Sequence, residues 1–329
     1  MNSSCNPKVT IAIPTFNRAS FLHQAVESAL AQTYQNIEII VSDNASTDAT
    51  KQLLSSYKEK GIVVIEQTQN VGMIQNWNAC LERATGEYFL LLSDDDVLEP
   101  MAIDKLVAPF LSRADTITIG IVFGRTRIVD EQLYEINKPI GGIPYEAGLD
   151  FCMNFLRGLR IVFPCSTLFR VSDLKQIGGY KGEKYFVACD AGALIEIILK
   201  RGYVVYLNEI TSNYRKHNSN LTNANQIERG IIISRALRDL VLAAIEDKNG
   251  QTYRKIQKAG EYHTANVIIG LLYQSSQNNR IPIIGFIREL ATYKIYLQNW
   301  QGITVLSRTL VKLISPSFYY LLRNLIRGV

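Results

Sequence analysis

Three consecutive aspartates, Asp94–Asp96, follow the apolar run YFLLL (88–92) after a single serine, Ser93. Neighbouring carboxylates repel one another, so three of them at the mouth of a buried strand cost stability unless cations neutralise them. Hard oxygen ligands of this kind suit Mg2+ or Mn2+. The run is therefore a candidate metal site. The alternative is a solvated acidic turn that caps a helix beginning near Glu99.

The elements that must position these aspartates form a regular pattern through the first 110 residues. Short β-rich apolar runs alternate with amphipathic helical segments, and this rhythm predicts a mostly parallel sheet covered by helices. The expected strands are 9–15, 37–43, 63–67 and 88–96, and the expected helices are 19–32, 47–60 and 73–84. Ligands bind beyond the carboxyl ends of such strands. The polar segments 14–18, 43–46 and 94–96 should therefore converge on one edge.

The remaining chain predicts a mixed region and then a helical extension. A strand is expected from 117, a helix over 145–158, a strand over 164–172, a short helix over 172–179, a helix over 190–201 and a strand over 204–209. The pair Gly178-Gly179 should supply left-handed conformations at a helix end. No linker interrupts this region, so we expect one α/β domain over 1–220 and a helical extension over 221–329. The helices of the extension are expected at 227–247, 252–275, 283–299 and 304–327.

Composition is that of an ordinary globular protein, with 47% hydrophobic and 20% charged residues among 329. The five cysteines are scattered and lack metal-ligand spacing, which favours reduced thiols in a reducing compartment. No basic segment followed by an apolar run opens the chain, and no window holds 18 uninterrupted apolar residues. We therefore expect a cytoplasmic location, no spanning helix and no nucleic-acid partner.

Four segments occur together in order: IAIPTFNR (11–18), VSDNASTD (41–48), QNVG (69–72) and GEYFLLLSDDD (86–96). Their combination closely resembles glycosyltransferase family 2, a group of inverting enzymes with the Rossmann-like GT-A fold, and the likeness covers about residues 8–217. The resemblance implies transfer of a single hexose or deoxyhexose from a UDP-, GDP- or dTDP-linked donor to a hydroxyl acceptor. It also implies a divalent cofactor, Mn2+ or Mg2+, that holds the donor diphosphate and stabilises charge on the leaving group.

The resemblance carries roles onto individual residues. Residues expected to bind the nucleotide sugar are Pro14, Thr15, Asn17, Arg18, Asp43, Asn44, Asn70, Gly72, Asp94 and Asp95. Among them Asp43 is expected to contact the base, Gly72 to allow close backbone approach, and Asp95 to contact the ribose or sugar. Asp96 is the expected principal metal ligand, with Asp94 in support. Asp43 and Asn44 have an alternative interpretation as turn residues that close a strand.

The segment GGYKGEKYFVACD (178–190) resembles the acceptor loop of the family, which places Asp190 as the catalytic base that takes the acceptor's proton. Many relatives have two acidic residues in tandem here, whereas Cys189 precedes Asp190. Asp190 also suits the N-cap of the following helix. In SNYRKHNSNLT (212–222) the likeness implies that Arg215 contacts phosphate and that His217 binds metal or phosphate, with a solvated polar loop as the alternative.

The segment 281–329 has six basic residues against one acidic, which equals the whole formal charge of +5. Basic and aromatic residues on an amphipathic helix over 304–327 favour peripheral attachment to the inner face of the cytoplasmic membrane. Such attachment fits a lipid-linked saccharide acceptor in bacterial surface polysaccharide or O-antigen assembly. Helices that simply pack on the catalytic domain are the alternative.

Two other functional classes are alternatives to a transferase, and each predicts different sequence features. A sugar nucleotidyltransferase should have a Gly-rich, basic triphosphate loop near the first strand, which is not found. A catalytically inactive nucleotide-binding or scaffold protein on the same fold is disfavoured by Asp96, Asp190 and His217. QIERG (226–230) has Gly230 where the QxxRW motif of processive synthases has its aromatic residue, which favours transfer of one sugar.

Overall fold

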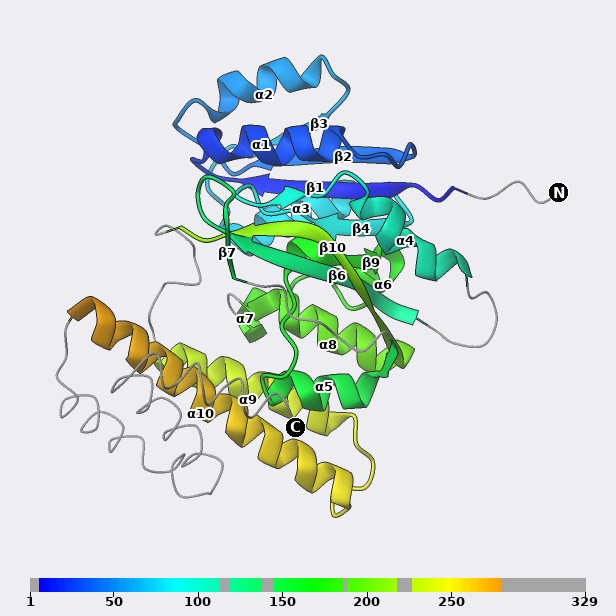
Figure 1. Ribbon diagram of the computed structural model, residues 1–329, viewed down its shortest axis with the longest axis vertical. Coiled ribbons are helices and arrows are strands. Elements are labelled where there is room, and N and C mark those ends of the chain that lie inside the picture. Colours follow the sequence, from blue (N-terminus) through cyan, green and yellow to red (C-terminus); the bar gives the residue numbers. More distant parts are fainter. Residues whose placement is uncertain (1–5, 113–118, 138–144, 186–187, 218–226, 280–329) are drawn as a thin grey trace. The chain divides into compact units, whose positions relative to one another are not determined.

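The computed structural model describes residues 6–112, 119–137, 145–185, 188–217 and 227–279 (Figure 1). The chain forms two compact units. One comprises Met1–Phe151 with Ile161–Leu221, and the other comprises Cys152–Arg160 with Thr222–Val329.

The first unit begins with the predicted alternation of strands and helices. Its first elements are β1 (Val9–Thr15), α1 (Ala19–Leu30), β2 (Ile37–Asp43), α2 (Thr50–Lys58), β3 (Val63–Glu66), α3 (Met73–Arg83), β4 (Tyr88–Leu91), β5 (Val97–Leu98) and α4 (Ala102–Ser112). Its later elements are β6 (Ile119–Val129), β7 (Glu135–Asn137), β8 (Tyr145–Ala147), α5 (Gly148–Leu156), the 3-10 turn η1 (Pro164–Ser166), β9 (Thr167–Arg170), α6 (Val171–Gln176), α7 (Gly182–Tyr185), α8 (Cys189–Arg201) and β10 (Tyr203–Arg215). The helix α5 extends past Phe151 into the second unit.

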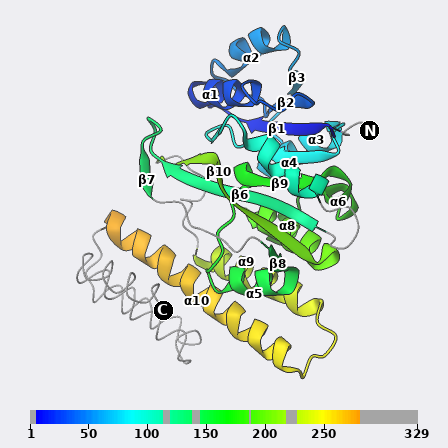
Figure 2. The ribbon, with the colours of Figure 1, turned by 45° about the vertical axis from the view of Figure 1, so that its right-hand side comes forward.

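The strands described here form one mixed sheet in the order β3-β2-β1-β4-β9-β6-β10-β5, with β7 on β6 and β8 on β10. The four strands β3, β2, β1 and β4 are parallel, as the sequence predicts. Beyond them, β9 is antiparallel to β4 and β6, β10 is parallel to β6, and β5 is antiparallel to β10. Figure 1 shows β2, β1 and β4 following one another down the view, with β6 and β10 below them, and Figure 2 shows β7 beside the end of β6.

The predicted helix over 145–158 is wrong in its first three residues. Tyr145–Ala147 is the strand β8, which pairs with the start of β10, and α5 begins only at Gly148. The N–H of Gly148 donates to the Gly202 carbonyl at 2.6 Å, so pairing with β10 sets where the helix begins. The predicted left-handed glycines are confirmed, because Gly178 and Gly179 have φ of 84° and 74° at the end of α6.

The carboxyl ends of the parallel strands meet at one edge. In the register of β1 and β2, Thr15 lies opposite Asp43, and Asp43 in turn lies opposite Glu66 of β3. Just past β4, the N–H of Leu92 donates to the Ala12 carbonyl at 2.9 Å, which keeps the following aspartates beside the end of β1. The convergence expected from topology is therefore confirmed.

Glu38 joins the amino ends of these strands. Its carboxylate accepts hydrogen bonds from the Thr10 hydroxyl, from the hydroxyl and N–H of Thr85, and from the N–H of Gly86, and it pairs with Lys8 at 3.1 Å. Burial alone raises the pKa of Glu38, but these donors outweigh burial and lower its pKa to about 2. The carboxylate therefore ties β1, β2 and the turn before β4 together.

The second unit contains α9 (Ile227–Ala243) and α10 (Gln251–Asn279), which pack on each other. Gly260 of α10 lies against the Arg238 side chain, and His263 bonds the Ser234 hydroxyl at 3.0 Å and stacks on Phe155. None of the helices described is both long and apolar enough to cross a membrane. The predicted helices at 283–299 and 304–327 lie outside the described residues.

Candidate functional site

The three consecutive aspartates lie in the turn between β4 and β5. Their exposed fractions are 6%, 5% and 1% for Asp94, Asp95 and Asp96. The N–H of Asp96 donates to the Ser93 carbonyl at 3.1 Å, which closes the turn. A solvated acidic turn, the alternative interpretation, is wrong, because all three carboxylates are buried. Buried carboxylates in sequence need positive partners nearby.

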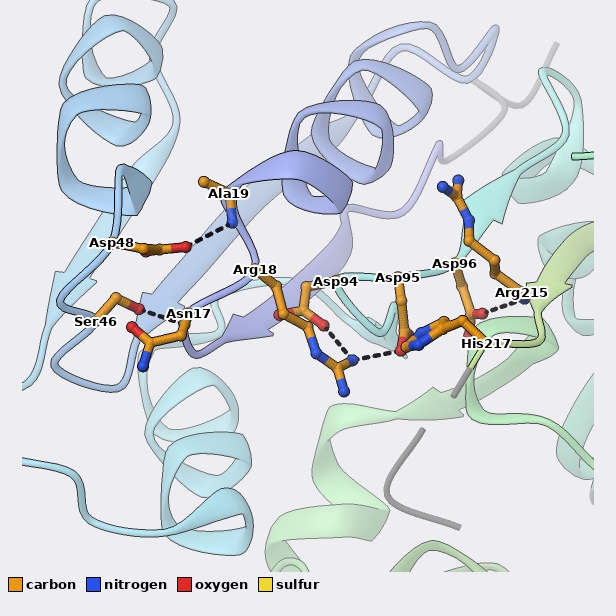
Figure 3. Close-up of polar contacts among 10 residues, drawn as sticks. All are labelled: Asn17, Arg18, Ala19, Ser46, Asp48, Asp94, Asp95, Asp96, Arg215 and His217. Atoms are coloured by element: carbon orange, nitrogen blue, oxygen red, sulfur yellow. Dashed lines mark hydrogen bonds and ion pairs between the residues drawn. The ribbon is translucent and has the colours of Figure 1, made fainter. Parts of the chain in front are cut away.

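Arg18 provides a positive partner, and the His217 ring provides a hydrogen-bonding one (Figure 3). Nη1 of Arg18 donates to Oδ1 of Asp94 at 3.2 Å and also bonds Oδ2 of Asp95. His217 Nε2 lies 3.0 Å from the same Asp95 Oδ2. One oxygen, Asp95 Oδ2, thus contacts both Arg18, from the loop between β1 and α1, and His217, from the segment after β10.

Asp94 is a carboxyl group whose charge is poorly supported. Burial and then the neighbouring Asp95 raise its pKa, Arg18 and the Thr15 hydroxyl oppose the rise only in part, and the resulting pKa is about 7. Without an added cation, the carboxyl group of Asp94 therefore takes up a proton near neutral pH.

Asp96 has one satisfied oxygen and one unsatisfied oxygen. Its Oδ1 accepts the N–H of Arg215 at 3.0 Å. Its Oδ2 is buried and accepts no hydrogen bond of normal geometry from the part of the chain described. Burial and then Asp95 raise the pKa of Asp96 well above its ordinary value, and the Arg215 N–H and the Cys165 thiol oppose this rise. A buried oxygen of this kind is costly unless a ligand occupies it.

The loop that carries Arg18 is locked to the loop after β2. The N–H of Asn17 donates to the Ser46 hydroxyl at 2.9 Å, and Asn17 Oδ1 accepts the N–H of Thr47 at 2.7 Å. Asp48 accepts the N–H of Ala19, the first residue of α1, at 3.1 Å (Figure 3). Asn17 itself has a φ of 54°, a strained conformation that these contacts maintain.

The loop after β2 and the loop after β3 together hold four of the predicted nucleotide-binding residues. Asp43 Oδ1 accepts the N–H of Ser46 at 3.0 Å, whereas Asp43 Oδ2 is buried and receives no hydrogen bond from the described part of the chain. Asn44 Nδ2 donates to Asn70 Oδ1 at 3.0 Å, and that oxygen also accepts the N–H of Gly72 at 2.9 Å. Gly72 has a φ of 86° where α3 begins, a conformation that favours glycine.

Pro14 and Thr15 end β1 and are buried in the sheet, opposite Ser42 and Asp43 of β2. Thr15 lies between the two groups of residues: it faces Asp43 across the sheet, and its hydroxyl, which forms no hydrogen bond of normal geometry with the described residues, lowers the pKa of Asp94. The structure therefore brings Thr15, Asn17, Arg18 and the aspartate turn together beside the loop after β2.

Arg215 is 1% exposed, and its side chain contacts α1. The guanidinium donates to Gln24 Oε1 at 2.6 Å and to the Glu131 carbonyl at 3.3 Å, and it lies 4.8 Å from the centre of the Phe21 ring. The His217 ring stacks on the same Phe21 ring, with 4.9 Å between the two ring centroids. Arg215 thus reaches Asp96 through its backbone N–H, and its guanidinium anchors the end of β10.

Asp190 lies in the first turn of α8, partly buried. Burial raises its pKa, and the N–H groups of Ala191 and of Asp190 itself oppose the rise. Tyr180, which follows the left-handed glycines, interacts electrostatically with Asp190 and forms an edge-on contact with Trp77 of α3. A raised pKa makes a carboxylate a better proton acceptor, so the environment suits a general base.

Several residues that shape the site are missed by sequence reasoning. Phe21 and Gln24 occupy ordinary helical positions, and only their three-dimensional contacts with Arg215 reveal their place. Asp48 is recognisable as a capping residue before α2, but its bond to the start of α1 has no local signal. Phe16 lies between two residues of the site and is 41% exposed. Its position as an aromatic residue in a polar segment at a strand end is visible in the sequence and indicates a binding surface.

The geometry presents hydrogen-bonding groups and buried carboxylates from five separate segments at one sheet edge, 14–18, 43–48, 70–72, 94–96 and 215–217. Within the described ranges, no three His, Cys, Asp or Glu side chains are grouped to hold a metal ion by themselves. A cation here would take its remaining ligands from a bound molecule, as Mg2+ does with substrate phosphates.

Comparisons with known proteins agree with this arrangement. The sequence model described as "Glycosyl transferase family 2" matches residues 10–178, just over half of the chain. An uncharacterised glycosyltransferase of Rickettsia felis is 33% identical over 184 residues, which cover 54% of this chain and 29% of that protein. The matched part thus spans less than a third of that relative's length.

Two solved structures show the fold. TarS 1–349 of S. aureus, in complex with UDP, has a TM-score of 0.57 and 16% identity, and the match covers 82% of this chain and 72% of that one. The mannosyltransferase PcManGT of Pyrobaculum calidifontis, in complex with GDP-Man and Mn2+, has a TM-score of 0.55 and 19% identity and covers 93% and 86%. With the GT-A fold in place and more than half of the sequence matched, the chain belongs to glycosyl transferase family 2.

Proposed function

We propose that this chain transfers a single sugar from a nucleoside-diphosphate donor to a hydroxyl acceptor, with inversion at the anomeric carbon. The observation that carries the proposal is the buried aspartate turn at the carboxyl edge of the sheet, in which Asp96 Oδ2 accepts no hydrogen bond of normal geometry from the described residues. The UDP and GDP-Man bound by the two structural neighbours support the donor class. The donor's base and sugar are left open among UDP-, GDP- and dTDP-linked hexoses and deoxyhexoses.

The residues present fit a divalent cation, Mn2+ or Mg2+. Asp96 offers an unoccupied carboxylate oxygen, and the raised pKa values of Asp94 and Asp96 describe a site that lacks positive charge. His217 is the second proposed ligand, and its Nε2 lies 3.0 Å from Asp95. When bound, the cation supplies charge stabilisation for the departing diphosphate.

The chain's own residues divide the remaining work. The loops after β2 and β3, with Asp43, Asn44, Asn70 and Gly72, are proposed to hold the nucleoside, because Asp43 Oδ2 is a buried acceptor that no donor of the described residues reaches. Pro14, Thr15, Asn17 and Arg18 line the diphosphate side with Asp94 and Asp95, and Phe16 adds an exposed aromatic face. Arg215 is proposed to contribute through its position at Asp96.

Asp190 is proposed to take the proton of the acceptor hydroxyl as that oxygen attacks the anomeric carbon. Attack on the face opposite the leaving diphosphate is a single displacement, which inverts the configuration. The raised pKa of Asp190 supports this role, and its place in the first turn of α8 fixes its backbone. The N-cap alternative is not supported as a side-chain cap, since the N-cap of α8 is Ala188.

The acceptor is proposed to be a lipid-linked saccharide of bacterial surface polysaccharide or O-antigen assembly. The basic segment 281–329 is the proposed contact with the inner face of the cytoplasmic membrane, and it lies outside the described residues. The domain division proposed for this arrangement is a catalytic part over 1–220 and a helical extension over 221–329.

Calorimetry with UDP, GDP and dTDP tests the function directly. We expect one of the three to bind in the presence of Mn2+ and to lose most of its affinity in EDTA, whereas a scaffold protein binds none of them. Asp96→Ala should abolish the metal-dependent part of binding. A panel of nucleotide sugars, tested for metal-dependent hydrolysis, then identifies the donor.

The base assignment is tested with Asp190→Asn. This variant should bind the nucleoside diphosphate normally and lose transfer by about 100-fold or more. Asp150→Asn is the matched control, because Asp150 is exposed in the first turn of another helix, α5. Transfer by Asp190→Asn at the parental rate would show that Asp190 is not the base.

A further inference from the structure

Arg18 occupies the position where positive charge is needed most. Its Nη1 bonds both Asp94 and Asp95, and its side chain is 20% exposed, whereas those of the two aspartates are 8% and 7% exposed. The guanidinium therefore lies at the boundary between the buried carboxylates and the outside (Figure 3). Arginine combines a permanent charge with a planar set of donors, so it can serve either carboxylates or phosphates.

The carboxylate contacts of Arg18 compete with the proposed donor complex. The cation needs the aspartate turn, and the diphosphate it would carry presents oxygens that suit a guanidinium. Asp96 Oδ2 is buried and accepts no hydrogen bond of normal geometry within the described ranges, which points to a ligand beside the same turn. Asp95 Oδ2 already contacts two side chains, Arg18 and His217, so an added cation would place a second positive charge beside the Arg18 guanidinium at that carboxylate.

We propose that Arg18 is a resident counter-ion, which holds Asp94 and Asp95 together in the empty enzyme, leaves them when a divalent cation binds, and then contacts the donor diphosphate. This inference rests on the proposed function. Arg18 can exchange partners by side-chain rotation alone, because its backbone is fixed through Asn17 and Ala19 by the loop after β2.

The exchange makes the binding of cation and donor cooperative. A cation alone displaces Arg18 from two carboxylates without bringing a new anion. A cation with a diphosphate brings an anionic partner for the guanidinium. Because such coupling is reciprocal, each ligand should strengthen the binding of the other by the same factor. Arg18 thereby favours joint binding over occupation by the cation alone.

The test measures Mn2+ affinity by electron paramagnetic resonance and diphosphate affinity by calorimetry, in the parental protein and in Arg18→Gln. The diphosphate is whichever of UDP, GDP and dTDP the parental protein binds. Arg18→Gln should bind Mn2+ alone about tenfold more tightly, and should bind the diphosphate with saturating Mn2+ about tenfold more weakly. These opposite changes are the signature of exchange, since mere structural damage weakens both.

Two further variants keep the test decisive. Arg18→Lys retains the charge, so its Mn2+ affinity should stay near the parental value while diphosphate affinity falls; it also serves if Arg18→Gln does not fold. Arg201→Gln is the matched control, because it removes a guanidinium paired with Asp173 at the end of α8, and neither affinity should change.

The outcomes separate the two proposals. A parental protein that binds none of the three diphosphates with Mn2+ contradicts the proposed function, and the inference falls with it. A parental protein that binds normally, with Mn2+ affinity in Arg18→Gln unchanged or weakened, overturns the counter-ion role alone. Normal circular dichroism of the variant establishes that the comparison concerns a folded protein.

Discussion

Replacing Asp94 by asparagine should make the metal-free protein more stable, and more so at higher pH. The pKa of Asp94 is about 7 in the folded chain because of burial and then Asp95, against an ordinary value near 3.9. In the folded protein the Asp94 carboxyl group thus keeps its proton up to about pH 7, whereas in the unfolded protein it loses that proton near pH 4. Between these values the folded state binds more protons, so the free energy of unfolding falls as pH rises.

The shift of about 3 pKa units corresponds to about 4 kcal/mol above pH 7, and roughly 2 to 3 kcal/mol of it develops between pH 5 and pH 8. Asparagine cannot ionise, so Asp94→Asn lacks this decline. The relevant measurement is urea unfolding in EDTA at both pH values, followed by circular dichroism, with Asp150→Asn as the control. If the parental protein and Asp94→Asn lose stability equally between pH 5 and pH 8, the burial argument is refuted.

The remaining predictions concern Glu38 at the amino ends of the strands and Asp48 beside the site. Glu38→Gln should cost about 3 kcal/mol at pH 7, because a pKa lowered to about 2 gives stability above pH 4.5 that disappears as pH falls through 2. Urea unfolding at pH 7 and pH 3 checks this, and an equal cost at both contradicts it. Asp48→Ala should cost about 1 to 2 kcal/mol, because it removes an acceptor shared by the first turns of α1 and α2. It should also weaken diphosphate binding through Arg18, which calorimetry measures; unchanged affinity would separate the cap from the site.

Much of the fold follows from patterns that are local in the sequence. The alternation of strands and helices up to residue 112 needs only hydrophobic periodicity, and the convergence of strand ends follows from parallel pairing. The pairing direction of later strands cannot be predicted in this way. Thr167–Arg170 is apolar in the same manner whether its neighbours run parallel or antiparallel, and only the completed sheet places β9 between β4 and β6.

The candidate site, like the fold, could be predicted from the sequence only in part. Asp94–Asp96 and the loop after β2 are visible as clusters of polar residues at strand ends, and the structure places them side by side. The pairing of Arg18 with Asp94 and Asp95 joins residues 76 and 77 positions apart, and the anchoring of Arg215 to Gln24 joins residues 191 apart. No local pattern specifies such partners, because they depend on which segments the sheet brings together.

The place of β10 in the sheet has a consequence for synthesis. It is the last strand of the first unit to leave the ribosome, yet it lies between β6 and β5. Until it emerges, one side of β6 presents unpaired backbone groups, and such an open strand is a template for association with other chains. A recombinant fragment that stops at residue 178, the limit of the family match, would keep that side open permanently and would be prone to aggregate.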